Sequence, residues 1–166
     1  MAMECRSGYI IIFEQLPWKY LDTLDIRSNL IQGHFPIPQP STVFYFLSNN
    51  QLFGEIPSLI CALTSIRRLD LSHNTLNGSI PLCLGNLSYL EVLDPWMNMF
   101  DGTIPTTISN GNSLINIFLN GNRLKGPLSR ALLYCKNLEI LDLGSNMIND
   151  TFPQWLESLP NPKFLY

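Results

Sequence analysis

The side chains of this sequence that could support chemistry are two histidines, four cysteines and a regularly placed set of aspartates. The histidines and cysteines are His34, His73, Cys5, Cys61, Cys83 and Cys135. They show none of the spacings of a zinc site, and the sequence contains no nucleophile elbow and no phosphate-binding loop. The sequence therefore predicts no metal site, no cofactor and no catalytic nucleophile.

The aspartates Asp25, Asp70, Asp94 and Asp142 are the remaining candidates, because two nearby carboxylates can act as acid and base. Each of them stands four residues before an asparagine that recurs along the chain. Their spacing follows from a repeat, in which equivalent side chains lie about 4.8 Å apart on neighbouring strands whatever their role. We therefore interpret them as framework, and we do not expect an enzyme.

The recurring asparagines define a repeat that covers most of the chain. They are Asn29, Asn50, Asn74, Asn98, Asn122 and Asn146, at successive intervals of 21, 24, 24, 24 and 24 residues. Apolar residues tend to stand eight, five and three positions before each asparagine and two positions after it, as Ile66, Leu69, Leu71 and Leu76 do around Asn74. The alternation just before the asparagine predicts a short strand with one buried face.

One such unit cannot bury its own apolar row, so the units must stack and pair their strands in a curved parallel sheet. In that stack the asparagine amides would satisfy the backbone groups left unpaired at each corner. The residues four places after the asparagines suit a bend with positive φ; they are Gly33, Gly54, Gly78, Gly102, Gly126 and Asp150. A proline that ends strand pairing follows three residues later in every unit except the fifth, which has Leu128-Ser129 before its next segment.

These residues carry a family resemblance. The chain resembles plant-type leucine-rich-repeat proteins, whose pattern LxxLxLxxNxLxGxIPxxL covers roughly residues 16–166. More narrowly, the phrases LPWKYLDTLDIRSNLIQGHFPIPQP, SLICALTSIRRLDLSHN and LGSNMINDTFPQWLESLP resemble the membrane-proximal repeats of plant receptor-like proteins. Receptor-like proteins of this kind are cell-surface receptors that lack a kinase of their own.

The resemblance implies an α/β leucine-rich-repeat solenoid of about six 24-residue repeats. A curved parallel β-sheet would form the concave face, and irregular or 3-10 segments would form the convex face. Residues 1–15 stay unassigned, and residues 16–166 form the repeat region, which ends within a seventh repeat.

The function implied by the resemblance is recognition of a peptide or protein ligand on the extracellular side of the plasma membrane. Signalling in defence or development would then pass through co-receptor kinases. Full-length relatives are membrane-anchored, although we expect neither a spanning segment nor a signal peptide in this sequence. The alternatives are a soluble extracellular inhibitor similar to polygalacturonase-inhibiting proteins and a non-functional truncated receptor fragment. A net charge of -3 with scattered signs gives no basic patch for nucleic acid.

Two prolines and one interval depart from the family pattern. Pro95 replaces a strand leucine, which predicts the loss of one inward leucine and of one backbone donor. Pro162 likewise stands where the next repeat requires leucine. The first interval is three residues short, so we expect the second coil to lack part of its convex segment.

The predicted contact surface consists of aromatic and arginine side chains between the inward leucines, because these residue types dominate binding hot spots. The candidates are Arg27, Phe44, Phe46, Arg67, Arg68, Trp96 and Phe118. In the alternative interpretation, the Pro95 irregularity and the short second coil turn the aromatic rings into the core.

Cysteines and glycosylation sequons fall outside the predicted concave sheet. Cys61 and Cys83 belong to neighbouring convex segments, where a disulfide in an oxidising compartment and two free thiols both stay open. Cys135 occupies an inward leucine position and is predicted to be a buried thiol, while Cys5 stays unassigned. Possible glycosylation sites are Asn77, Asn86 and Asn149, all expected on segments outside strands.

Overall fold

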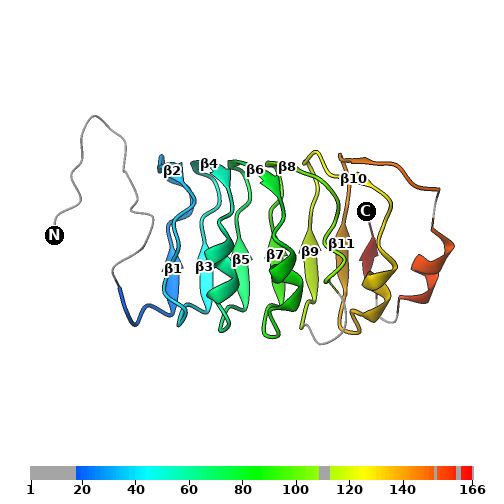
Figure 1. Cartoon of the computed structure of the whole chain (residues 1–166), viewed down its shortest axis with the longest axis horizontal. Coiled ribbons are helices and arrows are strands. Elements are labelled where there is room, and N and C mark those ends of the chain that lie inside the picture. Colours follow the sequence, from blue (N-terminus) through cyan, green and yellow to red (C-terminus); the bar gives the residue numbers. More distant parts are fainter. Residues whose placement is uncertain (1–17, 109–112, 152, 160–161, 166) are drawn as a thin grey trace.

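The chain folds into a stack of coils in which each coil contributes one short strand to a single parallel sheet (Figure 1). The computed structural model describes residues 18–108, 113–151, 153–159 and 162–165. The strands of this sheet pair in the order β1-β3-β5-β7-β9-β11-β13. Their bounds are Thr23–Asp25 (β1), Phe44–Phe46 (β3), Arg68–Asp70 (β5), Val92–Asp94 (β7), Asn116–Phe118 (β9), Ile140–Asp142 (β11) and Phe164–Leu165 (β13). The solenoid and parallel sheet predicted from the repeat are confirmed.

In β3, β5, β7, β9 and β11 the central residue is buried and its two neighbours turn outward, whereas Leu24 at the centre of β1 is half-buried. In β5, Leu69 has no exposed surface, whereas Arg68 is exposed and Asp70 is half-buried. The central residues stack in register from coil to coil, as Leu69, Leu93 and Ile117 do. Burial of such apolar rows, at about 25 cal/mol per Å² of apolar surface, is the main term that stabilises a stack of this kind.

The asparagine side chains connect consecutive coils. The amide of Asn98 donates to the carbonyls of Leu71 (3.0 Å) and Pro95 (3.2 Å), which belong to different coils. Its Oδ1 accepts from the N–H of Leu76 at 3.0 Å, in the preceding coil. The same bonding pattern recurs at Asn50, Asn74, Asn122 and Asn146. Asn29 is exposed, and its side-chain amide donates to carbonyls of its own coil, those of Ile26 and Arg27.

A second set of strands follows the asparagines and was not predicted. One sheet has the order β2-β4-β6-β8, with bounds Gln32–His34, Gln51–Glu55, Thr75–Ser79 and Met99–Asp101. A shorter sheet pairs β10 (Lys125–Gly126) with β12 (Met147–Ile148). Asn77 lies in β6, so its expected place outside strands is wrong. These segments are two to five residues long, and β2, β4, β6 and β10 contain glycine, a poor strand former, so the sequence pattern gives little sign of pairing.

The convex face carries short 3-10 helices, as predicted. They are η1 (Ser58–Ala62), η2 (Leu82–Asn86), η3 (Arg130–Tyr134) and η4 (Gln154–Ser158). Prolines precede three of them, and Ser129 precedes η3, where its Oγ accepts from the N–H of Ala131. Residues 35–43 contain no helix, which confirms that the coil with the short interval lacks this convex element.

The cysteines lie on the convex side and in the core. Cys61 in η1 and Cys83 in η2 form a disulfide with a Cα–Cα distance of 5.5 Å. Cys135 is not part of a disulfide, and its thiol is fully buried in the apolar core, as predicted. Cys5 lies outside the described residues. The disulfide therefore joins two adjacent coils on the face opposite the parallel sheet.

Pro95 removes one backbone donor but leaves the asparagine column intact. The pairing of β7 with β9 covers two residue pairs, Val92 with Asn116 and Leu93 with Ile117, instead of three. The proline ring itself is buried and occupies the inward position of the missing leucine. Its carbonyl still accepts from the amides of Asn98 and Asn122. Pro95 therefore costs only one backbone N–H donor, because the asparagine side chains bond to the carbonyl oxygen of this residue and not to its nitrogen.

Candidate functional site

The aromatic candidates of the second coil lie on the outward side of the parallel sheet. Phe44 and Phe46 are half-buried, and their rings are nearly parallel with centroids 6.3 Å apart. Tyr45, between them, is fully buried and donates its hydroxyl to the carbonyl of Pro36 at 2.7 Å. The short second coil therefore fills its core with Tyr45, and the two phenylalanines form part of the concave surface.

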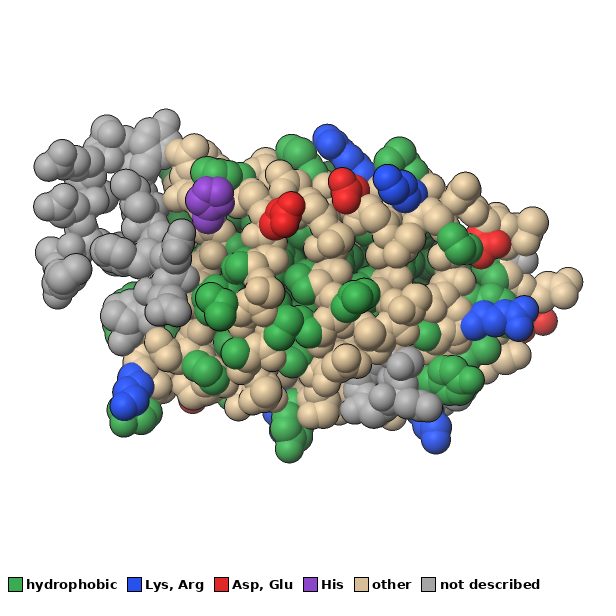
Figure 2. Space-filling view, viewed as in Figure 1, with side chains coloured by type: hydrophobic (Ala, Val, Ile, Leu, Met, Phe, Trp, Pro, Cys, Tyr) green, Lys and Arg blue, Asp and Glu red, His purple; other side chains and the backbone are tan. Residues whose placement is uncertain are grey.

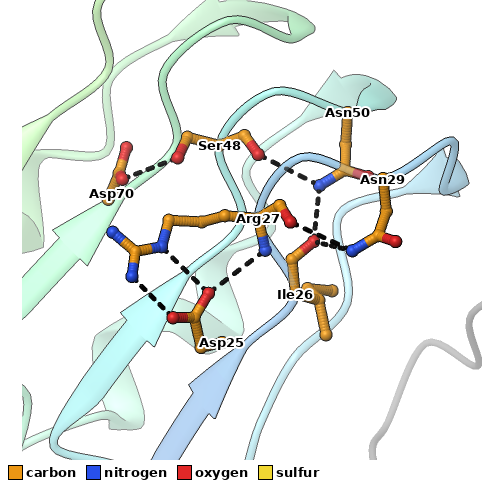
Figure 3. A network of polar contacts seen from close by, with 7 residues as sticks. All are labelled: Asp25, Ile26, Arg27, Asn29, Ser48, Asn50 and Asp70. Atoms are coloured by element: carbon orange, nitrogen blue, oxygen red, sulfur yellow. Dashed lines mark hydrogen bonds and ion pairs between the residues drawn. The ribbon is translucent and has the colours of Figure 1, made fainter.

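Arg27 is held in place by its own coil and the next one. Its Nε and Nη2 donate to the two carboxylate oxygens of Asp25 at 2.9 and 2.6 Å (Figure 3). Its guanidinium also lies 4.7 Å from the centre of the Phe46 ring. The hydrogen bond from Arg27 holds the pKa of Asp25 below its usual range. Arg27 and Asp25 thus form a neutral pair that buttresses the aromatic surface.

Arg68 in β5 and Arg67 just before it differ in their ion-pair partners. Arg67 donates to Glu91 of the next coil at 2.6 Å. Arg68 is exposed, and within the described part of the chain no carboxylate lies within ion-pair distance of it. It stands in register with Phe44 on one side and Val92 on the other. Arg68 therefore presents an unneutralised cation between two apolar side chains.

Aspartates of the same outward row surround one aromatic ring. Phe118 in β9 is in register with Asp142 in β11, and Asp94 in β7 occupies the equivalent position on its other side. Asp142 accepts from the amide of Asn120 at 3.2 Å and from the N–H of Gly144, while Asp94 accepts from the N–H of Trp96. Neither is paired with lysine or arginine among the described residues. A half-buried aromatic face is thus flanked by two carboxylates without a cation.

Burial raises the pKa of Asp94 to about 7, and the nearby carboxylates of Asp70 and Asp142 add to this effect. Since its folded pKa lies above the ordinary value of 3.8, the folded state holds more protons than the unfolded chain between pH 4 and 7. The free energy of unfolding should therefore fall as pH rises through that interval. At about 1.4 kcal/mol per pKa unit, Asp94 accounts for on the order of 2–4 kcal/mol of this loss.

We expect Asp94→Asn to remove this pH dependence. Urea unfolding followed by circular dichroism at pH 4.5 and pH 7.5 measures it, and Asp101→Asn, an exposed aspartate in β8, is the matched control. The variant should be more stable than the original chain at pH 7.5 and should gain much less at pH 4.5. An equal change in the free energy of unfolding at both pH values would show that Asp94 is ionised as an ordinary surface carboxylate.

Strand β9 adds two amides that the sequence analysis missed. Asn116 and Phe118 lie on its outward side and Asn120 follows just after its end, and Asn116 stands in register between Val92 and Ile140. The Oδ1 atom of Asn116 is buried and has no hydrogen-bond partner within the described structure. Buried amide oxygens are normally bonded, so this one marks a place where a donor is missing. The sequence signal for an outward position of Asn116 was its place two residues before Phe118, since every second residue of a strand lies on the same face.

The edge of the concave face beside β7 is also aromatic. Trp96 is 41 % exposed, and its ring lies 4.8 Å from that of His73 in the preceding coil, edge to face. His73 and Met97 both precede a column asparagine and both have positive φ, of 53° and 52°. Both side chains are exposed. The residue types do not predict this conformation, because such φ values favour glycine, which stands at this position only as Gly121.

The three sequon asparagines, Asn77, Asn86 and Asn149, are all exposed. On the side of the molecule seen in Figure 2, hydrophobic side chains are scattered over a mostly uncharged surface, with charged groups toward its rims. In the described part of the chain, no three histidine, cysteine or carboxylate side chains converge to hold a metal ion. The same residues include no helix of the length and apolarity needed to cross a bilayer.

Comparison with known proteins agrees with this architecture. The Leucine Rich Repeat family matches residues 65–87 and 137–159. Receptor-like protein 35 of Arabidopsis thaliana is 47% identical over 133 residues, which are 76% of this chain and 13% of that protein. Receptor-like protein 7 of the same species is 41% identical over 72 residues, which are 43% of this chain and 7% of the relative. The chain thus spans only a small part of the curated relatives that it matches.

A solved structure gives the same fold. The ectodomain of the Arabidopsis receptor kinase HAESA, in complex with an extended IDA peptide hormone, superimposes with a TM-score of 0.79 and 29% identity. The match covers 83% of this chain and 24% of that ectodomain. HAESA has also been solved with both the peptide and the co-receptor SERK1. The stacked coils, the asparagine column and these similarities show that the chain is a plant-type leucine-rich-repeat protein whose repeats are similar to those of receptor-like proteins.

Proposed function

We propose that this chain is the ligand-recognition part of a plant cell-surface receptor-like protein and that its concave face binds a peptide. The observation that carries the proposal is the outward row of aromatic and charged side chains on the parallel sheet. Phe44, Phe46 and Phe118 lie in that row and Trp96 lies at the edge beside β7, and none of the four is in the core. Aromatic side chains that are at least partly exposed can bury much area at a small entropic cost when a ligand binds.

Three further features support an extracellular receptor. The Cys61–Cys83 disulfide suits an oxidising compartment, and the sequon asparagines are accessible to a glycosyltransferase. The solved HAESA complexes contain a peptide hormone and a co-receptor. By analogy, the receptor would sit on the outer side of the plasma membrane and signal through partner kinases in defence or development. In this proposal the chain acts by binding a ligand and not by catalysis.

A retention experiment tests the proposal. The 166-residue chain is immobilised and exposed to the low-molecular-weight peptide fraction of plant extracellular fluid, and retained peptides are identified by mass spectrometry. Phe118→Ala removes an aromatic from the concave face, whereas Tyr89→Ala removes an exposed aromatic outside the parallel sheet and serves as the control. We expect the original chain and the control to retain the same peptides and Phe118→Ala to lose them. Equal retention by all three, or none above blank matrix, contradicts the proposal.

A further inference from the structure

Positive and negative side chains lie at different places on the concave face, and this arrangement restricts which ligands it can bind. Arg68 lies in the row of side chains six residues before the asparagines, on β5. Asp94 and Asp142 lie in the row four residues before them, on β7 and β11. Each of these three groups lacks an ion-pair partner among the described residues. A ligand that neutralised only one sign would leave the other uncompensated.

The negative end is shaped for a cation. The ring of Phe118 lies between the strands that carry Asp94 and Asp142, at one strand spacing of about 4.8 Å from each. An ammonium or guanidinium group over this ring would gain a cation–π contact and two carboxylates at once. The orphaned oxygen of Asn116, on the same strand and the same side, could turn outward and accept from a ligand N–H. A cationic group of a ligand would therefore contact an aromatic ring and an amide oxygen as well as the two carboxylates.

The positive end is shaped for an anion. The guanidinium of Arg68 is exposed between Phe44 and Val92, and a planar guanidinium can donate two parallel hydrogen bonds to one carboxylate. From Arg68 on β5 to Phe118 on β9 the path crosses two strand spacings and advances two residues, which is about 12 Å. An extended chain rises about 3.3 Å per residue and places every second side chain on one face. Two groups four residues apart match this distance on the same side.

We infer that the concave face recognises an extended peptide in which a basic side chain and an acidic group stand four residues apart. The basic side chain lies over Phe118 between Asp94 and Asp142, and the acidic group pairs with Arg68. The inference rests on the proposed function and adds to it the chemistry of the ligand.

A set of synthetic peptides tests this inference. The probes are acetylated and amidated seven-residue peptides of alanine and serine that carry Lys and Glu at the second and sixth positions in either order. Lys–Lys and Glu–Glu peptides and a Lys–Glu pair one residue apart are the controls. Binding to the 166-residue chain is measured by fluorescence anisotropy at low salt. We expect a spaced Lys–Glu pair in one of the two orders to bind at least about 10-fold more tightly than each control.

Charge-reversal variants assign the two ends. Asp142→Lys should lose affinity for the spaced Lys–Glu peptide by at least about 10-fold and should now prefer the Glu–Glu peptide, and Arg68→Glu should come to prefer Lys–Lys. Arg123→Glu and Asp101→Lys, both exposed and outside the parallel sheet, should change nothing. A switch of preference requires a folded protein, so loss of structure cannot imitate it.

Several outcomes would overturn the inference. One is equal binding of all peptides, and another is a Lys–Glu preference that Asp142→Lys leaves unchanged. Binding of oligogalacturonides in place of peptides, or self-association that covers the concave face in sedimentation, would do so as well. If no synthetic peptide binds while the extracellular peptide fraction is still retained, the inference fails and the proposed function stands. If neither is bound, both fail.

Discussion

Replacing Asn98 by alanine should lower the free energy of unfolding by about 3–5 kcal/mol. The side chain is buried and bonds to four backbone groups, which are the carbonyls of Leu71, Pro95 and Trp96 and the N–H of Leu76. Alanine would leave the N–H of Leu76 without its acceptor in the interior. Each buried group without a partner costs about 1–3 kcal/mol, and the loss would fall on two consecutive coils.

The exposed Asn29 provides the matched control for Asn98. Its amide donates only to carbonyls of its own coil, so water can replace it, and Asn29→Ala should cost less than about 1 kcal/mol. Urea unfolding of the two variants, followed by circular dichroism, compares them directly. Equal destabilisation would show that the asparagine column does not connect the coils, whereas a large difference confirms that it does.

Removal of the Cys61–Cys83 disulfide by the double variant Cys61→Ser, Cys83→Ser should lower the free energy of unfolding by about 3 kcal/mol. The two cysteines are separated by 22 residues, and opening a loop of this size returns that much entropy to the unfolded chain. In a solenoid each coil contacts only its neighbours, so the bond between η1 and η2 also limits separation of two adjacent coils.

Reduction separates the disulfide from the effect of the serines. Dithiothreitol should lower the melting temperature of the original chain toward that of the double variant and should leave the double variant unchanged. The buried Cys135 is present in both proteins and cancels from the comparison. If reductant has no effect on the original chain, the bond is absent or contributes nothing to stability.

The concave sheet could be predicted because its signal is repeated and physically simple. Leu69, Leu93 and Ile117 alternate with outward residues, and the same spacing recurs in every coil, so a strand with one buried face is the only arrangement that fits. The asparagine gave the corner of each coil, since a short amide that both donates and accepts has few other uses at a fixed interval. The convex 3-10 helices followed from the resemblance.

The second set of strands could not be predicted from the same pattern. In β6, Leu76 is the one buried residue and Asn77 and Gly78 are poor strand formers, so pairing is established by the stack and not by local preference. The positive φ values at His73 and Met97 are similar: the corner requires them and the residue types do not reveal them. Local sequence therefore underestimates how much of each coil is held by its neighbours.

The sequence singled out the aromatic and arginine candidates but not how their side chains are paired. Arg27, Arg67 and Arg68 look alike in the sequence, yet Asp25 and Glu91 neutralise the first two and only Arg68 stands without an ion-pair partner in the described structure. All the aspartates of this row were interpreted as framework, but the structure gives them different surroundings. Asp70 accepts from the hydroxyls of Ser48 and Ser72, whereas Asp94 lies near other carboxylates without a cation. Such differences depend on register between coils, which spacing alone does not give.

The measurement that tests the central claim most directly is photo-crosslinking of a bound peptide. A peptide retained by the chain is resynthesised with a diazirine-bearing leucine, irradiated in the complex, and the crosslinked segments are identified by mass spectrometry. If the concave face is the ligand site, crosslinks should fall on the outward residues of β3, β5, β7, β9 and β11 and on the adjoining Trp96. Crosslinks concentrated on η1, η2 and η3 would place the ligand on the convex face and contradict the account.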